Sequence, residues 1–376
     1  MQRIRYYCAR EAAERLGVSR QTLYSYVSRG RLRAHADGAS RESRYLADEV
    51  NQLAVRLARG HNPRAIVAEA LNWGLPVVES SICLIQNGRL YYRGEDVLSL
   101  VENASFEEVA ELLWGHGGGR SQEVLPRDFV SLAARSKRLP TELAMSRLFA
   151  WVAESENCDD LLFAMASCSV GSPLAQGPVP VAMGKRWRLS APKCDVLRVA
   201  LILCADHELN ASSFTVRTVA STGASLNAAL QGGLAALSGP RHGGSTNHVE
   251  ALLDEWSASR RSRAALQSKL GAGEIVPGFG HPLYPDGDIR ARVLLERVSE
   301  KGCVELARAV ERGGGLKPNL DFALVALRRA LGLPRGAAFG LFAVGRTVGW
   351  LAHALEQRER KQLMRPRAAY IGPQPQ

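Results

Sequence analysis

Helical periodicity runs through the sequence from residue 75 onward and restricts this part of the chain to a mainly α architecture. Runs that alternate polar and apolar residues are scarce there, and no segment of about 20 to 50 residues repeats. The exception is residues 81–92, where the Asn87-Gly88 pair predicts a β-hairpin. Two acidic residues soon after Ser105 predict a helix start, because negative charge is favourable in a first helical turn.

The bulk composition is that of an ordinary globular protein, with 46% hydrophobic and 23% charged residues. No run of about 18 apolar residues predicts a membrane span, and the stretch after Met1 lacks the apolar core of a signal peptide. The seven cysteines include no Cys-x-x-Cys pair and no zinc-type spacing. We therefore expect a cytoplasmic protein with reduced thiols, no bound metal and no membrane partner.

The positive charge of the chain is concentrated at its N-terminus. The formal net charge is +11, and residues 1–60 contain twelve Arg and only six acidic residues. About half of the excess charge therefore lies in this short segment, which indicates an anionic partner. A basic surface that only aids solubility is the alternative.

Two short helices joined by a tight turn are predicted near the N-terminus. Residues 9–16 are strong helix formers, Gly17 ends the helix, and Ser19 can cap a second helix that runs from about residue 20 to 28. Leu23 and Val27 are four residues apart and should face inward. The exposed start of this helix fits a DNA major groove, and a basic hairpin-like wing follows it. The predicted DNA contacts are Arg20, Gln21, Thr22, Tyr24, Arg41 and Arg44.

The order Glu-Ala-Ala-Glu, Leu-Gly-Val-Ser, Gln-Thr-Leu-Tyr and Ser-Arg-Gly-Arg-Leu resembles the winged helix-turn-helix of the MerR and excisionase families over residues 6–56. The alternative is a three-helix appendage used for subunit packing. His61-Asn62-Pro63 breaks the following helix. We therefore expect a winged helix-turn-helix domain at 1–60 and a linker at 61–74.

Four clusters in the helical part carry side chains suited to chemistry. Three place a histidine beside a breakpoint or a glycine-rich turn, where ring nitrogens can donate to a carbonyl that gains negative charge. The fourth places Asp321 in an apolar setting, where its pKa could suit proton abstraction. The clusters are Asp206–Asn210, Gly239–Gly244, Val276–His281 and Pro318–Phe322. An electrophile and a base are therefore both available.

The spacing of the residues excludes several other kinds of catalytic or binding site. His207-Glu208 is not a zinc protease motif, because position 211 is Ala rather than His. No Gly-x-Ser-x-Gly elbow occurs, and the residues from Gly177 to Lys185 do not have the spacing of a phosphate loop. Gly271-x-Gly273 lacks the third glycine of a dinucleotide fingerprint.

Residues from about 72 to 373 resemble citrate synthase, the family that condenses acetyl-CoA with oxaloacetate. The matching motifs occur in the family's order: Leu90–Gly94, Asp206–Ser213, Pro240–Gly244, Gly278–His281, Asn319–Phe322, Arg346–Trp350 and Arg365–Arg367. The resemblance implies a nearly all-helical fold with a large domain at 75–245 and 323–376 and a small domain at 246–322. It also implies a homodimer.

The resemblance implies a role for each matching residue. His242 would hydrogen-bond the thioester oxygen, Asp321 would remove the methyl proton, and His281 would polarise the oxaloacetate carbonyl. The two carboxylates of oxaloacetate would be bound by His207, Arg290, Arg346 and Arg365, the last from the neighbouring subunit. Acetyl-CoA, or propionyl-CoA, would be a co-substrate with no tightly bound cofactor, and its contacts would be Val276, Pro277, Gly278, Phe279 and Gly280. Structural roles for Arg346 at a helix end and Arg365 in a basic tail remain open.

The match departs from the family's pattern after His281. Pro282 and Pro285 stand where the family usually has basic residues, which weakens the expected contact with CoA phosphates. The interval from Arg290 to Asp321 is also shorter than usual. Two hypotheses follow: a working citrate or 2-methylcitrate synthase fused to a DNA-binding module, or a transcription regulator whose synthase-derived domain senses CoA esters or 2-oxo acids.

Overall fold

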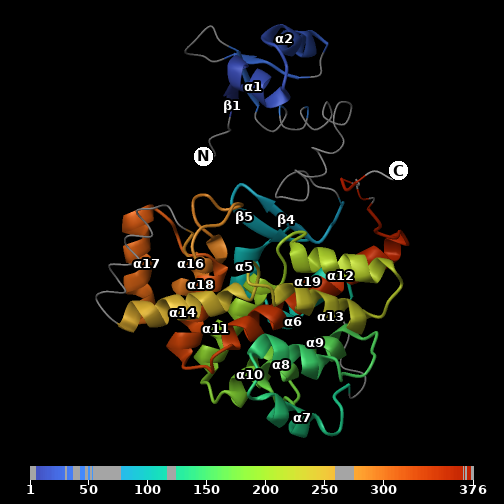
Figure 1. Ribbon diagram of the computed structural model, residues 1–376, viewed down its shortest axis with the longest axis vertical. Helices are drawn as coiled ribbons and strands as arrows, with labels where there is room; N and C mark the ends of the chain where they lie inside the picture. The colour runs from blue at the N-terminus through green and yellow to red at the C-terminus, as the bar shows by residue number, and fades with distance from the viewer. Residues whose placement is uncertain are drawn as a thin grey trace. The chain divides into compact units, whose positions relative to one another are not determined.

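The protein divides into two compact units, Met1–Glu79 with Arg367–Gln376, and Ser80–Pro366. The computed structural model (Figure 1) describes residues 6–29, 32–36, 43–46, 50, 53, 78–116, 124–258, 275–366, 368 and 371–373. The predicted linker at 61–74 lies outside these residues. The predicted division into a large and a small helical domain stays a prediction, because the second unit is not divided further.

The first unit contains the two predicted short helices. α1 (Ala9–Leu16) ends at Gly17, which adopts the left-handed conformation with φ 65°. α2 (Arg20–Ser28) begins after Ser19, whose side chain accepts a hydrogen bond from the Thr22 N–H. The end of α1 at Gly17 and the start of α2 after Ser19 therefore confirm the two predicted capping residues.

A three-stranded antiparallel sheet completes this unit, with the order β1-β3-β2. Its strands are β1 (Tyr6–Cys8), β2 (His35–Ala36) and β3 (Ser43–Leu46). β2 and β3 pair as the predicted wing. The unit has its own apolar core, built from Ala12, Ala13, Leu16, Leu23, Leu32, Tyr45, Val50 and Leu53.

The second unit begins with the predicted hairpin. β4 (Cys83–Gln86) pairs with β5 (Arg89–Tyr92), and Asn87 and Gly88 form the turn between them with φ 56° and 73°. Positive φ at both central positions is the signature of the hairpin turn that Asn-Gly favours. β6 (Glu95–Asp96) adds a short third strand.

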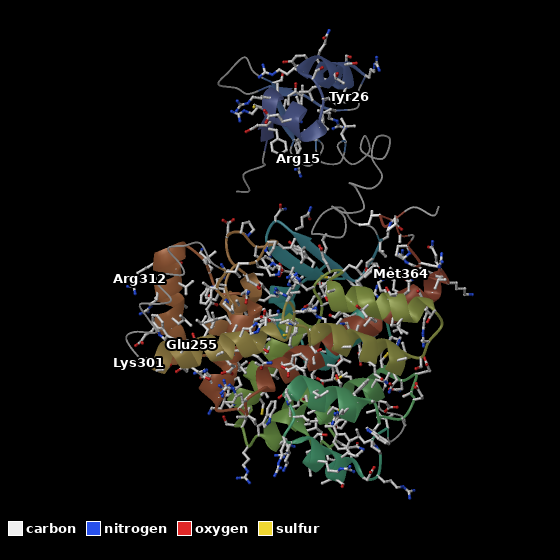
Figure 2. All side chains as sticks on the ribbon, viewed as in Figure 1. Arg15, Tyr26, Glu255, Lys301, Arg312 and Met364 are labelled. Carbon is white, nitrogen blue, oxygen red and sulfur yellow. The ribbon has the colours of Figure 1, made fainter. Side chains whose placement is uncertain are left out.

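All other named elements of the second unit are helices, so the mainly α fold class is confirmed. They are α5 (Val97–Asn103), α6 (Phe106–Trp114), α7 (Phe129–Ser136), α8 (Thr141–Phe149), α9 (Cys158–Val170), α10 (Val179–Arg186), α11 (Ala191–Cys204), α12 (Ala211–Ser221), α13 (Leu226–Leu237), α14 (Ser245–Ala258), α16 (Ile289–Leu295), α17 (Lys301–Gly314), α18 (Leu320–Leu331) and α19 (Ala337–Arg360). α6 begins at Ser105 with a capping box, as its acidic first turn predicted. α17 carries exposed charged residues such as Lys301 and Arg312 (Figure 2).

The long helix α19 forms the centre of the second unit and packs against α9, α11, α12, α13 and α18 (Figure 1). By length and composition alone it could cross a membrane, but 94% of its apolar window is buried inside the protein, as in a core helix. Glycines let it approach its neighbours closely. A Cβ on Gly345 would lie 2.6 Å from Cys204 Cβ at the end of α11. This contact sets α19 directly beside the chain segment that begins the candidate site.

Candidate active site

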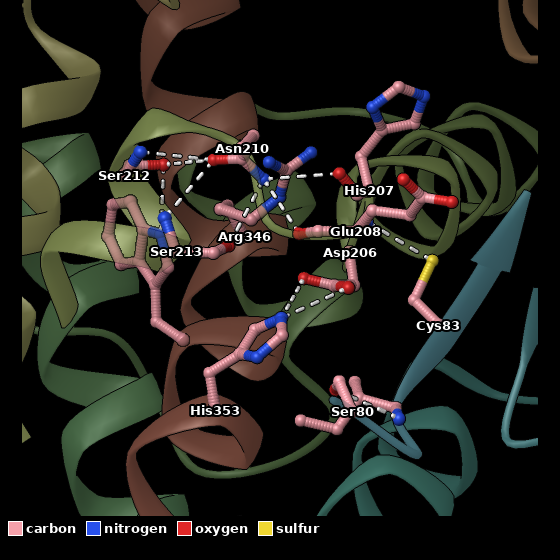
Figure 3. A network of polar contacts seen from close by, with 12 residues as sticks. Ser80, Cys83, Asp206, His207, Glu208, Asn210, Ser212, Ser213, Arg346 and His353 are labelled. Atoms are coloured by element: carbon pink, nitrogen blue, oxygen red, sulfur yellow. Dashed lines mark hydrogen bonds and ion pairs between the residues drawn. The ribbon is translucent and has the colours of Figure 1, made fainter. Parts of the chain in front are cut away.

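The turn from α11 to α12 presents the first histidine cluster (Figure 3). Asn210 caps α12, and its side-chain oxygen accepts hydrogen bonds from the Ser212 and Ser213 N–H groups at 3.1 Å. Glu208 has a positive φ of 51°, which is uncommon outside glycine. Its carboxylate accepts the Ile85 N–H of β4 at 3.2 Å, so the hairpin anchors this turn.

His207 is buried at the base of this turn. Its Nε2 lies 2.9 Å from Tyr284 Oη, and its ring meets the His281 ring edge to face at a centroid distance of 5.1 Å. Burial, with the nearby Arg290 charge, holds the pKa of His207 well below its usual range. The imidazole is therefore neutral at pH 7, and its Nε2 is hydrogen-bonded to the Tyr284 hydroxyl.

His242 lies in a compact turn just before α14. Gly244 makes this turn possible, because a Cβ there would collide with Ser238 O and lie 2.8 Å from Gly239 O. Nε2 of His242 is 2.8 Å from Ser212 Oγ, which links this turn to α12. Burial, followed by the Arg346 charge, lowers the pKa of His242 to about 3.

The segment from Val276 to His281 is tied by its backbone to the start of α18. Gly280 N–H donates to Lys317 O at 2.9 Å, and Asn319 N–H donates to Gly278 O at 2.9 Å. Nδ1 of His281 accepts the Leu283 N–H at 3.2 Å. Burial, followed by the Arg290 charge, lowers the pKa of His281 to about 4. His281 is therefore also neutral at pH 7.

Asp321 lies in the first turn of α18, which Asn319 caps. Its Oδ2 accepts a 2.6 Å hydrogen bond from Ser245 Oγ, three residues after His242. Burial raises the pKa of Asp321 to about 6, against the opposing effect of the Ser245 hydrogen bond. A carboxyl group with this pKa can exchange a proton near neutral pH.

Two of the three predicted arginines are buried near these groups. Arg290 forms a two-pronged ion pair with Asp288, at 3.0 Å from Nε and 2.8 Å from Nη2. Arg346 donates from Nε to Cys204 O at 2.8 Å, as the structural alternative expected. Its Nη2 is nevertheless buried without a hydrogen-bond partner in the part of the chain that the structure describes. Arg365 is exposed, and no hydrogen bond or ion pair joins it to the site among the residues that the structure describes.

Several site residues were assigned no role from the sequence, although Asn210 and Ser212 lie within the motif Asp206–Ser213. They are Asn210, Ser212, Ser245, Tyr284 and Asp288. Asp288 had a usable signal, because an Asp directly before an apolar run is a helix cap. The others carry hydroxyl or amide groups with no distinctive spacing, and only the folded chain brings them to the histidines and Asp321.

The predicted DNA contacts lie in the first unit. Arg20, Gln21 and Arg44 are exposed, and Tyr24 is 52% exposed. Thr22 is half-buried, and its hydroxyl lies 2.9 Å from Ser19 Oγ within the helix cap. Arg41 lies outside the described residues.

The helical fold of the second unit gathers the Asp321 carboxyl group, three neutral imidazoles and two buried guanidinium groups, an arrangement suited to acid–base chemistry on an anionic ligand. Residues 70–170 and 181–367 match the family described as citrate synthase, C-terminal domain. The chain therefore belongs to the citrate synthase family. Residues 6–54 separately match the family described as helix-turn-helix domain.

Similar proteins span most of the chain. Citrate synthase 2 of Bacillus subtilis strain 168 is 30% identical over 81% of this chain and 95% of its own length. 2-Methylcitrate synthase 2 of Corynebacterium glutamicum is 32% identical over 76% of this chain and 90% of its own. The crystal structure of citrate synthase from Thermotoga maritima MSB8 aligns with a TM-score of 0.66 and 29% identity, covering 80% of this chain and 94% of that one.

Proposed function

We propose that the second unit condenses an acyl-CoA, acetyl-CoA or propionyl-CoA, with oxaloacetate and releases free CoA. The observation that carries this proposal is the Asp321 carboxyl group, whose pKa burial raises to about 6. It is joined through Ser245 to the turn that holds His242. A general base with a pKa near the working pH is effective, because it is ionised and still takes a proton readily.

The reaction begins with proton transfer from the acyl α-carbon to Asp321. The electron pair moves onto the thioester oxygen, where His242 stabilises the developing negative charge. The enol carbon then attacks the ketone carbon of oxaloacetate, and a carbon–carbon bond forms. His281 donates to the ketone oxygen, which takes up a proton. Water finally attacks the thioester carbon, the C–S bond breaks, and the thiol leaves with a proton.

The hydrogen bonds favour a tautomer of His281 that suits its role and hold the His242 ring in place. The Leu283 N–H donates to Nδ1 of His281, so the proton of the neutral ring is on Nε2, which can act as a donor. Ser212 Oγ accepts the Trp350 indole N–H at 3.1 Å and donates to Asn210 Oδ1 at 2.7 Å. Nε2 of His242 lies near both oxygens, at 2.8 Å from Ser212 Oγ and 3.2 Å from Asn210 Oδ1, so these contacts fix the position of the His242 ring.

Oxaloacetate would be held by fixed cations. The buried Arg346 Nη2, which lacks a partner among the described residues, supports a role in binding a carboxylate. Arg290 lies beside His281 and His207, and Arg365 would reach the site of a partner subunit, which makes a homodimer part of the proposal. CoA would bind along residues 276–280, with no tightly bound cofactor.

The test is release of free thiol from acetyl-CoA and from propionyl-CoA in the presence of oxaloacetate. We expect the full chain to release thiol from at least one of them, and the Asp321→Asn variant to lose this activity. The ratio of kcat/KM for the two acyl-CoAs then assigns the substrate. Release no faster than in the absence of protein, with both acyl-CoAs, would rule the proposal out.

We also propose that the first unit binds DNA, with Arg20 and Arg44 contacting phosphates. The exposed start of α2 and the paired wing strands support this assignment. Replacing both arginines with alanine should weaken binding and reduce the slope of log affinity against log salt by up to about 2. The control removes the same charge from α17 in the other unit, as Arg308→Ala with Arg312→Ala. Equal effects of the two double variants would contradict the assignment.

A regulator that senses acyl-CoA is the second candidate function. It is favoured by the exposed Pro282 and Pro285, at positions where phosphate-binding cations were expected. A regulator predicts that acyl-CoA or oxaloacetate changes DNA affinity while thiol release is slow. All seven cysteines are free, which supports a cytoplasmic setting for either function.

A further inference from the structure

Ser245, the first residue of α14, makes a hydrogen bond that no sequence motif predicted. Its Oγ–H donates to Oδ2 of Asp321 at 2.6 Å, across 76 residues of sequence. The short distance is typical of a hydroxyl that donates to an ionised carboxylate. Oδ1 of Asp321 accepts no hydrogen bond from any residue within the described ranges.

The position of Ser245 is set by the same turn that carries His242. The Ser245 N–H donates to His242 O at 2.8 Å, and the Gly244 N–H donates to Leu237 O at 3.0 Å. Gly244 leaves this turn no room for a larger residue. The serine hydroxyl therefore has a fixed place relative to the His242 backbone, and through it α14 sets the position of a carboxyl group on α18.

The charges around Asp321 come from several elements. Arg290 of α16 and Arg346 of α19 favour its ionised form, whereas Asp288 opposes it. Asp288 is itself paired with Arg290. The Cys204 thiol at the end of α11 is also within electrostatic range. None of these groups donates a hydrogen bond to the Asp321 carboxylate. Among the residues described, only Ser245 donates a side-chain hydrogen bond to it.

We propose that Ser245 is a positioning residue for the general base: its hydroxyl holds Oδ2 of Asp321, so that Oδ1 is the oxygen that takes the substrate proton. This inference rests on the proposed condensation. The hydroxyl has a second effect, because a donor to a carboxylate favours the ionised, proton-accepting form. The raised pKa of Asp321 would be higher without it.

The test compares Ser245→Ala with the wild type in the full chain. We expect the acidic limb of kcat/KM against pH to move upward by about one pH unit or more, since a hydrogen bond to a charged group has roughly that strength. At pH 7 kcat should fall at least about tenfold, while KM for oxaloacetate changes less than about twofold. Ser245→Thr keeps the hydroxyl and should restore the limb.

The matched control is Thr246→Val in the same turn. Thr246 is buried and its hydroxyl donates to Gly243 O at 2.8 Å, without contact with Asp321. This variant should lower thermal stability and leave the acidic limb in place. An acidic limb that is the same in Ser245→Ala as in the wild type would overturn the inference.

A titration that needs no turnover separates this inference from the proposed function. Carboxyl-carbon NMR of 13C-labelled aspartate, with Asp321 assigned by its loss in Asp321→Asn, reports the ionisation directly. An upward shift of this titration in Ser245→Ala supports the Ser245 contact even if no thiol is released, in which case the condensation proposal fails. Identical titrations in the two proteins overturn the Ser245 inference whatever the activity.

Discussion

Nε2 of His353 lies 3.3 Å from both carboxylate oxygens of Asp206, and both side chains are buried (Figure 3). Nδ1 of the same ring is 3.2 Å from Arg217 Nη1. A guanidinium group can only donate, so Nδ1 accepts and the proton of a neutral ring is on Nε2, facing Asp206. Arg217 also forms an ion pair with Glu356. Helix α19 therefore holds, through His353, the residue directly before His207.

Gly349 is the second contact between α19 and this turn, and it gives the first prediction. A Cβ at this position would collide with Ala205 O and lie 2.5 Å from Asp206 Oδ1. Gly349→Ala should therefore shift the His207 turn and lower kcat/KM by roughly 10- to 100-fold, as expected for a displaced binding group. The effect should appear mainly in KM for oxaloacetate, measured by thiol release at saturating acyl-CoA.

Gly340→Ala on the same helix is the control for this prediction. Its added Cβ would meet Ser169 Cβ at 3.3 Å, a contact that a small shift can relieve. We expect kcat/KM within about twofold of the wild type and a comparable or smaller loss of thermal stability. Equal losses of activity in the two glycine variants would show that general disruption of α19, and not the turn before His207, is responsible.

Tyr284 gives the second prediction, because its hydroxyl is 2.9 Å from His207 Nε2 and the side chain is buried. Tyr284→Phe keeps the ring and leaves a buried imidazole nitrogen without its partner, which costs about 1–3 kcal/mol. KM for oxaloacetate should rise roughly 5- to 100-fold, while KM for acyl-CoA stays within about twofold. Tyr91→Phe, on the β-hairpin, is the matched control and should change neither constant.

Asp321→Asn gives a prediction in which stability and activity move in opposite directions. The proton acceptor is lost, so kcat should fall by roughly 10²- to 10⁴-fold. The raised pKa of about 6, against 3.8 for an ordinary Asp, means that the folded wild type binds this proton more tightly than the unfolded chain does. The resulting stability is present below about pH 4 and is lost as the pH rises through 6.

The amide group of the variant does not ionise, so the variant does not lose stability as the pH rises through 6. In urea unfolding, the free energy of unfolding of Asp321→Asn relative to that of the wild type should therefore increase between pH 4 and 7, by roughly 1–3 kcal/mol. Near pH 4 the difference should reach its minimum. A difference that does not vary with pH would contradict the raised pKa, even if the activity is lost as expected.

Local signals in the sequence predicted local structure well. Ser19 and Gly17 marked the ends of α2 and α1, and Asn87-Gly88 marked the hairpin, because each depends on backbone conformations within a few residues. The motifs of the proposed active site were also visible from the sequence, since each combines a histidine or an acid with a breakpoint.

The contacts between motifs could not be predicted in the same way. Ser245 meets Asp321 across 76 residues and His207 meets Tyr284 across 77, so each pair depends on how whole helices pack. Arg346 shows a different limit. From the sequence, a structural role and a substrate-binding role are alternatives, whereas in the fold its Nε donates to Cys204 O and its Nη2 is buried without a partner among the described residues.

Glu250 gives the last prediction, which separates the stability of the fold from its chemistry. This buried carboxylate on α14 accepts two hydrogen bonds from Arg328, at 2.7 and 2.8 Å, and two from Arg329, at 3.1 and 3.0 Å. Removing one partner of a buried ion pair is costly, because it leaves charge without compensation. Glu250→Gln should therefore lower the free energy of unfolding by about 3 kcal/mol. This value is at the lower end of the usual range, because both arginine side chains are 17% exposed to solvent.

The matched control is Arg335→Ala, which removes an ion pair to Asp254 from a side chain that is 67% exposed and should cost less than about 1 kcal/mol. Asp321 lies on the same helix as both arginines but keeps its own contacts, the Asn319 cap and the Ser245 hydroxyl. Below the unfolding temperature, Glu250→Gln should thus retain kcat within about twofold and keep the acidic limb of its pH profile. If kcat falls together with the free energy of unfolding, the ion pairs of Glu250 between α14 and α18 help to place the general base, and the two helices must act as one unit in catalysis.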